Sequence, residues 1–121
     1  MARVLLVEDD RWVADCYQLW LCQAGHTLQH ASDAQAALDA LNETRFDIIV
    51  LDMLLPQANG VQLLHQLQSY PDLASTPVIL CSTTQAPAIT DLQAYGVVAA
   101  LDKTNLTPQK LQKAVQTYAA S

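Results

Sequence analysis

Four apolar runs of this sequence are each followed by residues that could do chemistry. These residues are Glu8, Asp9 and Asp10 after the first run, Asp52 after the second, Ser82, Thr83 and Thr84 after the third, and Asp102 and Lys103 after the fourth. Oxygen ligands of this kind suit a hard divalent cation, and Mg²⁺ takes one or two carboxylates, keeps waters and leaves a position for a phosphoryl oxygen. The residue types therefore favour a site for a hard divalent cation such as Mg²⁺, provided that the fold brings the four places together.

Carboxylates gathered in one place repel one another. Two of them about 4 Å apart repel by roughly 4 kcal/mol at an effective dielectric constant near 20, so a counter-charge is expected beside them. Among the three lysines, only Lys103 stands at the end of an expected strand. A single acid after a strand is commonly a helix cap, and Asp10 fits that role. Acids at three strand ends are much harder to explain in that way.

The elements that must position these residues form an alternation of strands and helices. Strands are predicted at Val4–Val7, Thr27–Ala31, Ile48–Leu51, Val78–Cys81 and Val97–Leu101. The first, third and fourth of these are continuous aliphatic runs, which are typical of parallel strands buried on both faces. The pattern therefore indicates a sheet that is covered by helices on both sides.

Five helices fit between and after these strands. They are predicted from about Asp10 to Ala24, from Ser32 or Asp33, after Asn59–Gly60, from Pro87 to before Gly96, and from Thr107–Pro108 onward. The first is expected to bury Val13, Cys16 and Trp20, which share a stripe at helical spacing. The last begins with an N-cap followed by a proline at the first helical position, and it is expected to turn Tyr118 inward.

Five successive strand–helix units predict an α/β fold with a parallel sheet and right-handed crossovers. Two arrangements compete at this length. A flavodoxin-like doubly wound sheet, with five parallel strands in the order 2-1-3-4-5 and five helices, gathers the carboxyl ends of its strands around one ligand site. Half of a β/α barrel would expose a sheet edge unless it dimerised. We therefore expect the doubly wound sheet.

The composition bounds the class of protein. With 121 residues, of which 51% are apolar and 15% charged, the chain suits one domain over residues 1–121 with a real core. A formal net charge of −6 argues against binding to nucleic acid or to an anionic membrane. The first apolar stretch is too short for a signal peptide or a membrane span, and three cysteines without a Cys/His cluster suit reduced thiols. We expect a soluble, cytoplasmic domain.

Several stretches of the sequence together carry a family resemblance. They are Val7–Asp10, the segment Leu51–Gly60 with the sequence LDMLLPQANG, and the separate residues Ser82 and Lys103. In this combination the chain resembles the receiver domain of two-component response regulators over almost its whole length. The segment that runs from Asp52 through Pro56 to Gly60 is the most specific part of the resemblance.

The resemblance implies a metal site and a phosphorylation site. Asp52 is implied as the phosphoacceptor. Asp9 and Asp52 are implied to hold Mg²⁺ directly, together with the backbone carbonyl of Leu54. Glu8 is implied to act mainly through a metal-bound water.

Three further residues are implied to contact the phosphoryl group: Ser82 by a hydrogen bond, Lys103 by its charge, and Thr83 through its backbone N–H. The implied function is a phosphoacceptor switch that takes phosphoryl from a phosphohistidine of a sensor histidine kinase or histidine phosphotransfer protein and then changes its binding to partners. Such a protein catalyses its own phosphorylation and dephosphorylation without being a turnover enzyme. A homodimer, a stand-alone regulator and the N-terminal part of a longer regulator all fit the sequence.

Besides the apolar Leu54 and the bulkier Thr83, which would alter access of water or kinase to the site, the chain departs from the family pattern at two further positions. Ala100 stands where an aromatic residue is common, so the usual coupling to movement of Ser82 would be changed. Thr104 follows Lys103 where a proline is common, and the loop lacks that constraint. These departures motivate an alternative function, a receiver-like domain that binds partners without being phosphorylated.

Two further hypotheses concern the surroundings of the acidic loop. A small flavin-binding electron carrier shares the fold, but Glu8, Asp9 and Asp10 would repel the phosphate that such a loop should hold through backbone N–H groups. Trp12 lies close to the same loop. It is expected either to be exposed and to dock the phosphodonor, because interface centres favour aromatic residues, or to be buried over the sheet.

Overall fold

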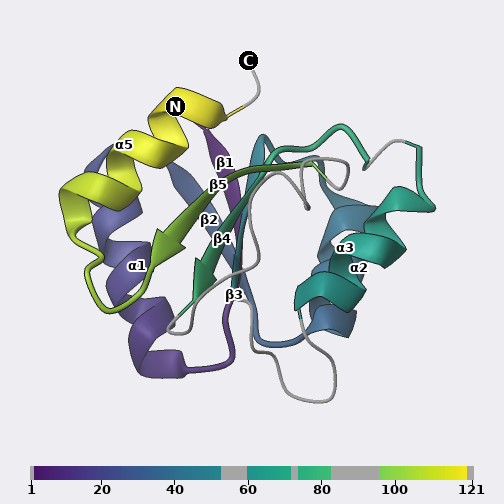
Figure 1. Ribbon diagram of the computed structural model, residues 1–121, viewed down its shortest axis with the longest axis horizontal. Helices are drawn as coiled ribbons and strands as arrows, with labels where there is room; N and C mark the ends of the chain where they lie inside the picture. Colours follow the sequence, from purple (N-terminus) through teal and green to yellow (C-terminus); the bar gives the residue numbers. More distant parts are fainter. Residues whose placement is uncertain (1, 53–59, 72–73, 83–95, 120–121) are drawn as a thin grey trace.

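A parallel β-sheet forms the centre of the computed structural model, which describes residues 2–52, 60–71, 74–82 and 96–119 (Figure 1). Its strands are β1 (Arg3–Val7), β2 (Thr27–Ala31), β3 (Ile48–Asp52), β4 (Val78–Ser82) and β5 (Val97–Asp102). They are hydrogen-bonded in the order β2-β1-β3-β4-β5, and all four pairings are parallel. This order confirms the doubly wound α/β sheet and differs from the sequential order that half of a β/α barrel would have.

Helices cover both faces of the sheet. Those within the described ranges are α1 (Arg11–Gln23), α2 (Ala34–Glu43), α3 (Gly60–Gln68) and α5 (Pro108–Tyr118). Figure 1 shows α1 and α5 together on one side of the sheet and α2 and α3 on the other. The helix predicted from Pro87 falls on residues outside the described ranges. In the part of the chain that is described, none of the helices combines the length and apolar content needed to cross a bilayer.

Each side of the sheet has its own apolar core. Leu5 and Val7 of β1 belong to the core that α2 and α3 cover, whereas Val4 and Leu6 belong to the core that α1 and α5 cover. Every residue of β3 and β4 is buried, as expected for parallel strands that are packed on both faces. Polar residues at the ends of these strands are therefore held by a close-packed frame.

Local sequence signals fix the helix that follows β1. The Asp10 carboxylate accepts hydrogen bonds from the backbone N–H groups of Trp12, at 2.9 Å, and Val13, at 3.3 Å. Asp10 is thus the N-cap of α1, as its residue type predicts. Gly25 follows the end of the helix with φ 88°, a backbone conformation in which a side chain would be strained.

The prediction of which residues α1 buries is wrong by one position along the helix. The fully buried residues of α1 are Ala14, Tyr17 and Leu21, and the predicted residues Val13, Cys16 and Trp20 are only partly buried. Both stripes have helical spacing, so periodicity alone does not decide which of them faces the sheet. Because α1 also packs against α5, the second stripe lies at the flank of the buried face.

Helix α5 begins as its capping residues predict. The Thr107 hydroxyl accepts a hydrogen bond from the backbone N–H of Lys110, at 3.2 Å, and Pro108 occupies the first turn. Tyr118, which was predicted to point inward, is 42% exposed. It is the last residue of α5, whose buried residues are Leu111, Ala114 and Val115.

Leu21 and Leu19 allow a matched test of how α1 is oriented. Leu21 is fully buried, whereas Leu19, two residues earlier in the same helix, is 57% exposed. We expect Leu21→Ala to lower the free energy of unfolding by about 2–5 kcal/mol, because it leaves a cavity in the core. Leu19→Ala should change it by less than about 0.5 kcal/mol. Urea unfolding followed by circular dichroism measures both values, and equal losses would contradict this orientation of α1.

Candidate functional site

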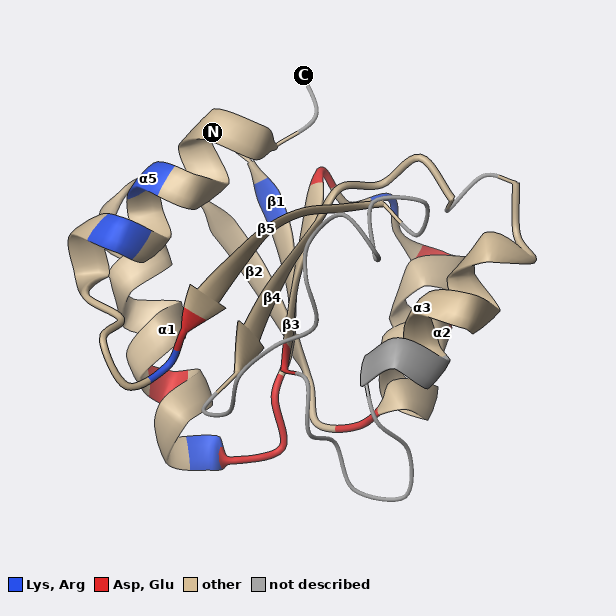
Figure 2. Ribbon diagram, in the orientation of Figure 1, with Lys and Arg blue, Asp and Glu red and all other residues tan. Residues whose placement is uncertain are grey.

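The carboxyl ends of four strands bring the predicted site residues together. Asp52 ends β3 and Ser82 ends β4, while Glu8 and Lys103 directly follow β1 and β5. The parallel register keeps these ends level, since Ser82 pairs with Asp102, the last residue of β5. Figure 2 shows the acidic residues along the loop between β1 and α1 and at the end of β3.

Three carboxylates meet at this edge of the sheet. One oxygen atom from each of Glu8, Asp9 and Asp52 lies within 4.8 Å of the others. Glu8 is 1% exposed and Asp52 is 7% exposed, whereas Asp9 is open to solvent. Two of the three charges are therefore largely removed from water, where their mutual repulsion is stronger.

Lys103 supplies positive charge to this cluster. Its Nζ lies 2.6 Å from Glu8 Oε1 and 3.6 Å from Asp52 Oδ2. The backbone N–H of Lys103 donates to the carbonyl oxygen of Ser82, at 2.9 Å, which ties the residue to the end of β4. Because the Lys103 side chain is only 13% exposed, its charge-assisted hydrogen bond to Glu8 is little weakened by solvent.

The cluster has more negative than positive groups. Three carboxylates against one ammonium leave an excess of two negative charges when all four groups are ionised. Burial, and then the interaction with Asp52, raise the pKa of Glu8 to about 8, although Lys103 opposes the shift. Burial would lower the pKa of Lys103, but its hydrogen bond to Glu8 and the charge of Asp52 outweigh that effect and raise it.

One atom of the cluster has no hydrogen-bond partner within the described part of the chain. This atom is Glu8 Oε2, which is buried, and burying a charged oxygen without a partner is costly. A hard divalent cation, bound directly or through a water, would satisfy this oxygen and offset the excess charge. The donor set consists of carboxylate oxygens, which suit Mg²⁺ or Ca²⁺ better than the softer transition metals. The residues present therefore fit a cation of this class.

A comparison with known protein families shows which family the chain belongs to. Residues 4–116 match the sequence profile of the response regulator receiver domain. The chain belongs to the response regulator receiver domain family. The family resemblance drawn from the strand-end residues is thereby confirmed.

Individual relatives agree with this assignment. The structure of the chemotaxis protein CheY4 from Vibrio cholerae is similar to this receiver domain with a TM-score of 0.88 and 27% identity, covering 98% of both chains. The response regulator ArlR from Staphylococcus epidermidis is 28% identical over 102 residues, which are 84% of this chain and 42% of that protein. The transcriptional regulatory protein MalR from Bacillus subtilis is 33% identical over 105 residues, which are 85% of this chain and 44% of that protein. The chain thus spans less than half the length of these two curated relatives.

The remaining residues implied by the resemblance are described only in part. Ser82 is 3% exposed and lies in β4, the strand next to the one that carries Asp52. Thr83 and Leu54 lie outside the described residues, so their backbone contacts stay predictions. The structure of this receiver domain thus brings Glu8, Asp9, Asp52 and Lys103 together and places Ser82 on the neighbouring strand end.

The loop after Lys103 is held by side-chain hydrogen bonds. Asp102 Oδ1 accepts from the Thr104 hydroxyl, at 2.7 Å, and from the Thr104 backbone N–H, at 2.9 Å. Both hydrogen bonds lower the pKa of Asp102, and the one from the Thr104 hydroxyl has the larger effect. Asp102 is therefore engaged in the turn and is not a member of the acidic cluster. The bonds constrain the loop at the position where the family commonly has a proline.

Sequence reasoning missed a contact from β2. His30 Nε2 lies 2.6 Å from the backbone carbonyl oxygen of Glu8, so a proton on Nε2 is donated to the residue that carries the central carboxylate. No local motif marks His30 for this role. The pairing of β1 with β2 could have found it, because Leu6 is opposite His30 and the Glu8 N–H donates to the carbonyl of Ala31.

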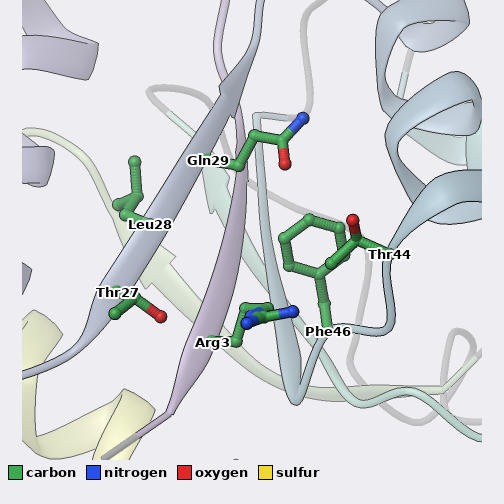
Figure 3. A pocket seen from close by; sticks show the side chains of 6 residues that line it. All are labelled: Arg3, Thr27, Leu28, Gln29, Thr44 and Phe46. Carbon is green, nitrogen blue, oxygen red and sulfur yellow. The ribbon is translucent and has the colours of Figure 1, made fainter.

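One cavity of this receiver domain adjoins the cluster, and another lies at the opposite end of the sheet. The first has a volume of about 370 Å³ and is lined by α1 together with Asp10 and Lys103. The second, of about 310 Å³, lies at the amino ends of β1 and β2. Figure 3 shows the side chains that line it, including those of Arg3 and Phe46. No acidic residue lines the second cavity, so it does not share the chemistry of the cluster.

Glu8 makes the stability of the metal-free protein depend on pH. Folding raises the pKa of Glu8 from 4.5 to about 8, so the folded state favours the protonated carboxyl group. The contribution of Glu8 to the free energy of unfolding therefore falls as the pH rises from about 4.5 to about 8. Glu8→Gln should remove this contribution, because the amide does not titrate.

Urea unfolding between about pH 5 and pH 8 in the presence of a chelator measures this effect. Asp15→Asn neutralises an exposed acid on α1 and serves as the control, since it should keep the pH dependence of the unchanged chain. If the Glu8→Gln protein also keeps the pH dependence of the unchanged chain, folding does not raise the pKa of Glu8.

Proposed function

We propose that residues 1–121 form a receiver domain that acts as the phosphoacceptor of a two-component phosphorelay, with Asp52 as the phosphorylated residue. The observation that carries this proposal is the position of Asp52. Its carboxylate is buried at the end of β3, near those of Glu8 and Asp9, and lies 3.6 Å from the ammonium of Lys103. A carboxylate is a competent nucleophile toward phosphorus when its surroundings neutralise the incoming charge.

The phosphoryl donor is a phosphohistidine on a sensor histidine kinase or a histidine phosphotransfer protein. An oxygen of Asp52 attacks phosphorus, and a new O–P bond forms as the N–P bond breaks. The electron pair of the N–P bond returns to the imidazole nitrogen, which takes up a proton from solvent. The step depends on positioning and charge neutralisation more than on proton transfer by the receiver.

The acidic cluster would hold Mg²⁺ beside the reacting atoms. Asp9, Asp52 and the backbone carbonyl of Leu54 would bind it directly, and Glu8 would act through a bound water. When bound, Mg²⁺ supplies positive charge opposite the phosphoryl oxygens. Glu8 has a second task, because its 2.6 Å hydrogen bond keeps the Lys103 ammonium within reach of Asp52.

Lys103 and Ser82 would then stabilise the phosphorylated form. The Lys103 ammonium pairs with a phosphoryl oxygen, the Ser82 hydroxyl donates to another, and the backbone N–H of Thr83 adds a further contact. Water later attacks phosphorus, and the electrons of the O–P bond return to the Asp52 carboxylate as inorganic phosphate leaves. The protein thus catalyses its own phosphorylation and dephosphorylation as a signalling switch rather than as a turnover enzyme.

Composition supports the setting of this proposal. The described cysteines are free thiols, which suits the reducing cytoplasm. The formal net charge of −6 disfavours direct contact of this domain with nucleic acid. The chemistry needs one copy of the chain, so a homodimer would serve signalling rather than phosphoryl transfer.

Replacement of Asp52 tests the assignment of the phosphoacceptor. Acetyl phosphate with Mg²⁺ should add the mass of one phosphoryl group to the unchanged protein, and Asp52→Asn should abolish this gain because the amide is not a nucleophile. Asp39→Asn, on the exposed side of α2, is the matched control and should be labelled normally. Intact-protein mass spectrometry gives the result.

Two outcomes of that experiment would count against the proposal. A phosphoryl group on the Asp52→Asn protein would refute Asp52 as the acceptor. A folded, unchanged protein that gains no phosphoryl mass with Mg²⁺ present would favour the alternative function, an interaction domain that works without phosphorylation.

Asp9 provides a separate test of the metal site. Asp9→Asn should raise the Mg²⁺ concentration needed for half-maximal phosphorylation by about tenfold or more, because a direct charged ligand is lost. Asp15→Asn removes an exposed charge from the same region of the chain and should leave that concentration nearly unchanged. Phosphorylation rates measured over a magnesium titration distinguish the two variants, and an equal response of both would argue against Asp9 as a ligand.

A further inference from the structure

The cavity beside α1 is lined mostly by residues to which the proposed phosphorylation assigns no role. It is lined on the helix by Trp12, Val13, Cys16, Tyr17 and Trp20, and we call it the α1 groove. The rings of Tyr17 and Trp20 lie with centroids 5.4 Å apart, and Trp12 is 76% exposed. A large apolar side chain that is open to solvent beside an aromatic-lined groove is typical of an interaction surface.

The exposed apolar surface extends along the helix from this groove. Leu19 is 57% exposed and follows Trp12 by seven residues, so the two side chains lie on the same side of α1. This side is distinct from the face that Ala14 and Leu21 bury in the core. Packing of the domain itself therefore does not account for the apolar side chains that α1 exposes.

Lys103 connects the α1 groove to the acidic cluster. The Lys103 side chain lines the groove, and its Nζ lies 2.6 Å from Glu8 Oε1 and 3.6 Å from Asp52 Oδ2. A change of charge at Asp52 therefore acts on a residue that forms part of the groove. The link needs no movement of the strands.

The charges around the groove favour a cationic partner. Asp9, Asp10 and Asp15 are all exposed at or near the first turns of α1, and Asp10 lines the groove. Arg11 is an exposed cation beside them, while the charge of Lys103 is offset by its ion pairs. The formal net charge of the whole chain is −6. An apolar segment that also carries Lys or Arg is thus electrostatically complementary to this surface.

We propose that the α1 groove binds a partner segment with a large apolar side chain flanked by Lys or Arg, and that phosphorylation of Asp52 strengthens this binding. The second part rests on the proposed function. A phosphoryl group adds negative charge at Asp52 and draws the Lys103 ammonium toward its oxygens, away from the groove. Both changes make the groove more negative, and both favour a cationic segment.

A synthetic amphipathic peptide serves as the probe. It carries a fluorescent label, leucine and tryptophan on one helical face and flanking lysines, and the matched control peptide has glutamate in place of each lysine. Fluorescence anisotropy with the full chain gives the affinity before and after treatment with acetyl phosphate and Mg²⁺. Intact-protein mass of the same samples gives the phosphorylated fraction. We expect the basic peptide to bind about threefold to tenfold more tightly after phosphorylation at low salt, with a smaller gain at high salt.

Variants of the exposed residues locate the bound peptide. Trp12→Ala should weaken peptide binding by about tenfold or more, as expected for an anchor residue of an interface. Leu19 is exposed and apolar but does not line the groove, so Leu19→Ala should weaken binding less. Circular dichroism checks that both variants are folded. Bound peptide should also slow maleimide labelling of Cys16, which lines the groove. The experiment uses the Cys22→Ser protein, because Cys22 is exposed, whereas Cys81 is only 1% exposed and should label little.

Five results would overturn the inference. If the phosphorylated and unphosphorylated proteins bind the peptide equally, with phosphorylation verified by mass, the coupling between Asp52 and the α1 groove is refuted and the proposed function stands. If the protein gains no phosphoryl mass, the proposed function is refuted, and the coupling with it. Equal binding of the acidic and basic peptides would refute the stated partner chemistry. If no peptide binds, and phosphoryl transfer to the Trp12→Ala protein is slower from a kinase but not from acetyl phosphate, the groove is assigned to the phosphodonor. If sedimentation shows self-association that depends on Trp12, the groove is assigned to a second copy of the chain.

Discussion

The hydrogen bond from Lys103 to Glu8 is the interaction on which the rest of the site depends. The two residues are 95 positions apart in the sequence and follow β1 and β5, between which β3 and β4 lie in the sheet. A 2.6 Å contact between them therefore requires four neighbouring strands to end at one level, with the long Lys103 side chain reaching back toward Glu8. Strands β3 and β4 meet this requirement because cores on both faces fix their side chains. The geometry of the site is thus a property of the whole sheet.

The charge of this site is balanced in stages. One ammonium cannot offset three carboxylates, and burial makes the ionised form of Glu8 unfavourable enough to raise its pKa to about 8. The same imbalance makes the cluster receptive to a divalent cation. In the proposed function, a bound cation together with Lys103 would favour a phosphoryl group, whose charge the carboxylates alone would repel. Each component would stabilise the next, so an arrangement that is costly by itself would suit the proposed phosphoryl transfer.

Much of the fold could be predicted from the sequence because local signals and burial agree there. Aliphatic runs identify the central strands, and Asp10 and Thr107 cap the helices that their residue types suggest. The candidate site followed because parallel strands share one carboxyl edge. The buried face of α1 did not follow, because Tyr17 and Trp20 belong to adjacent stripes of equal periodicity and packing against α5 decides between them. The contact of His30 with Glu8 depends on strand pairing, which no local pattern of residues encodes.

The residues of β5 bear on how such a site could pass its state to the protein surface. Ala100 is partly buried against the core on the α2 and α3 side of the sheet, and its methyl group has no side-chain rotamers to exchange. Lys103 has several rotatable bonds, contacts the acidic cluster and lines the cavity on the other side of the sheet, beside α1. Under the proposed phosphorylation, the charge added at Asp52 would therefore reach the surface most directly through Lys103, and the expected readout would lie at α1.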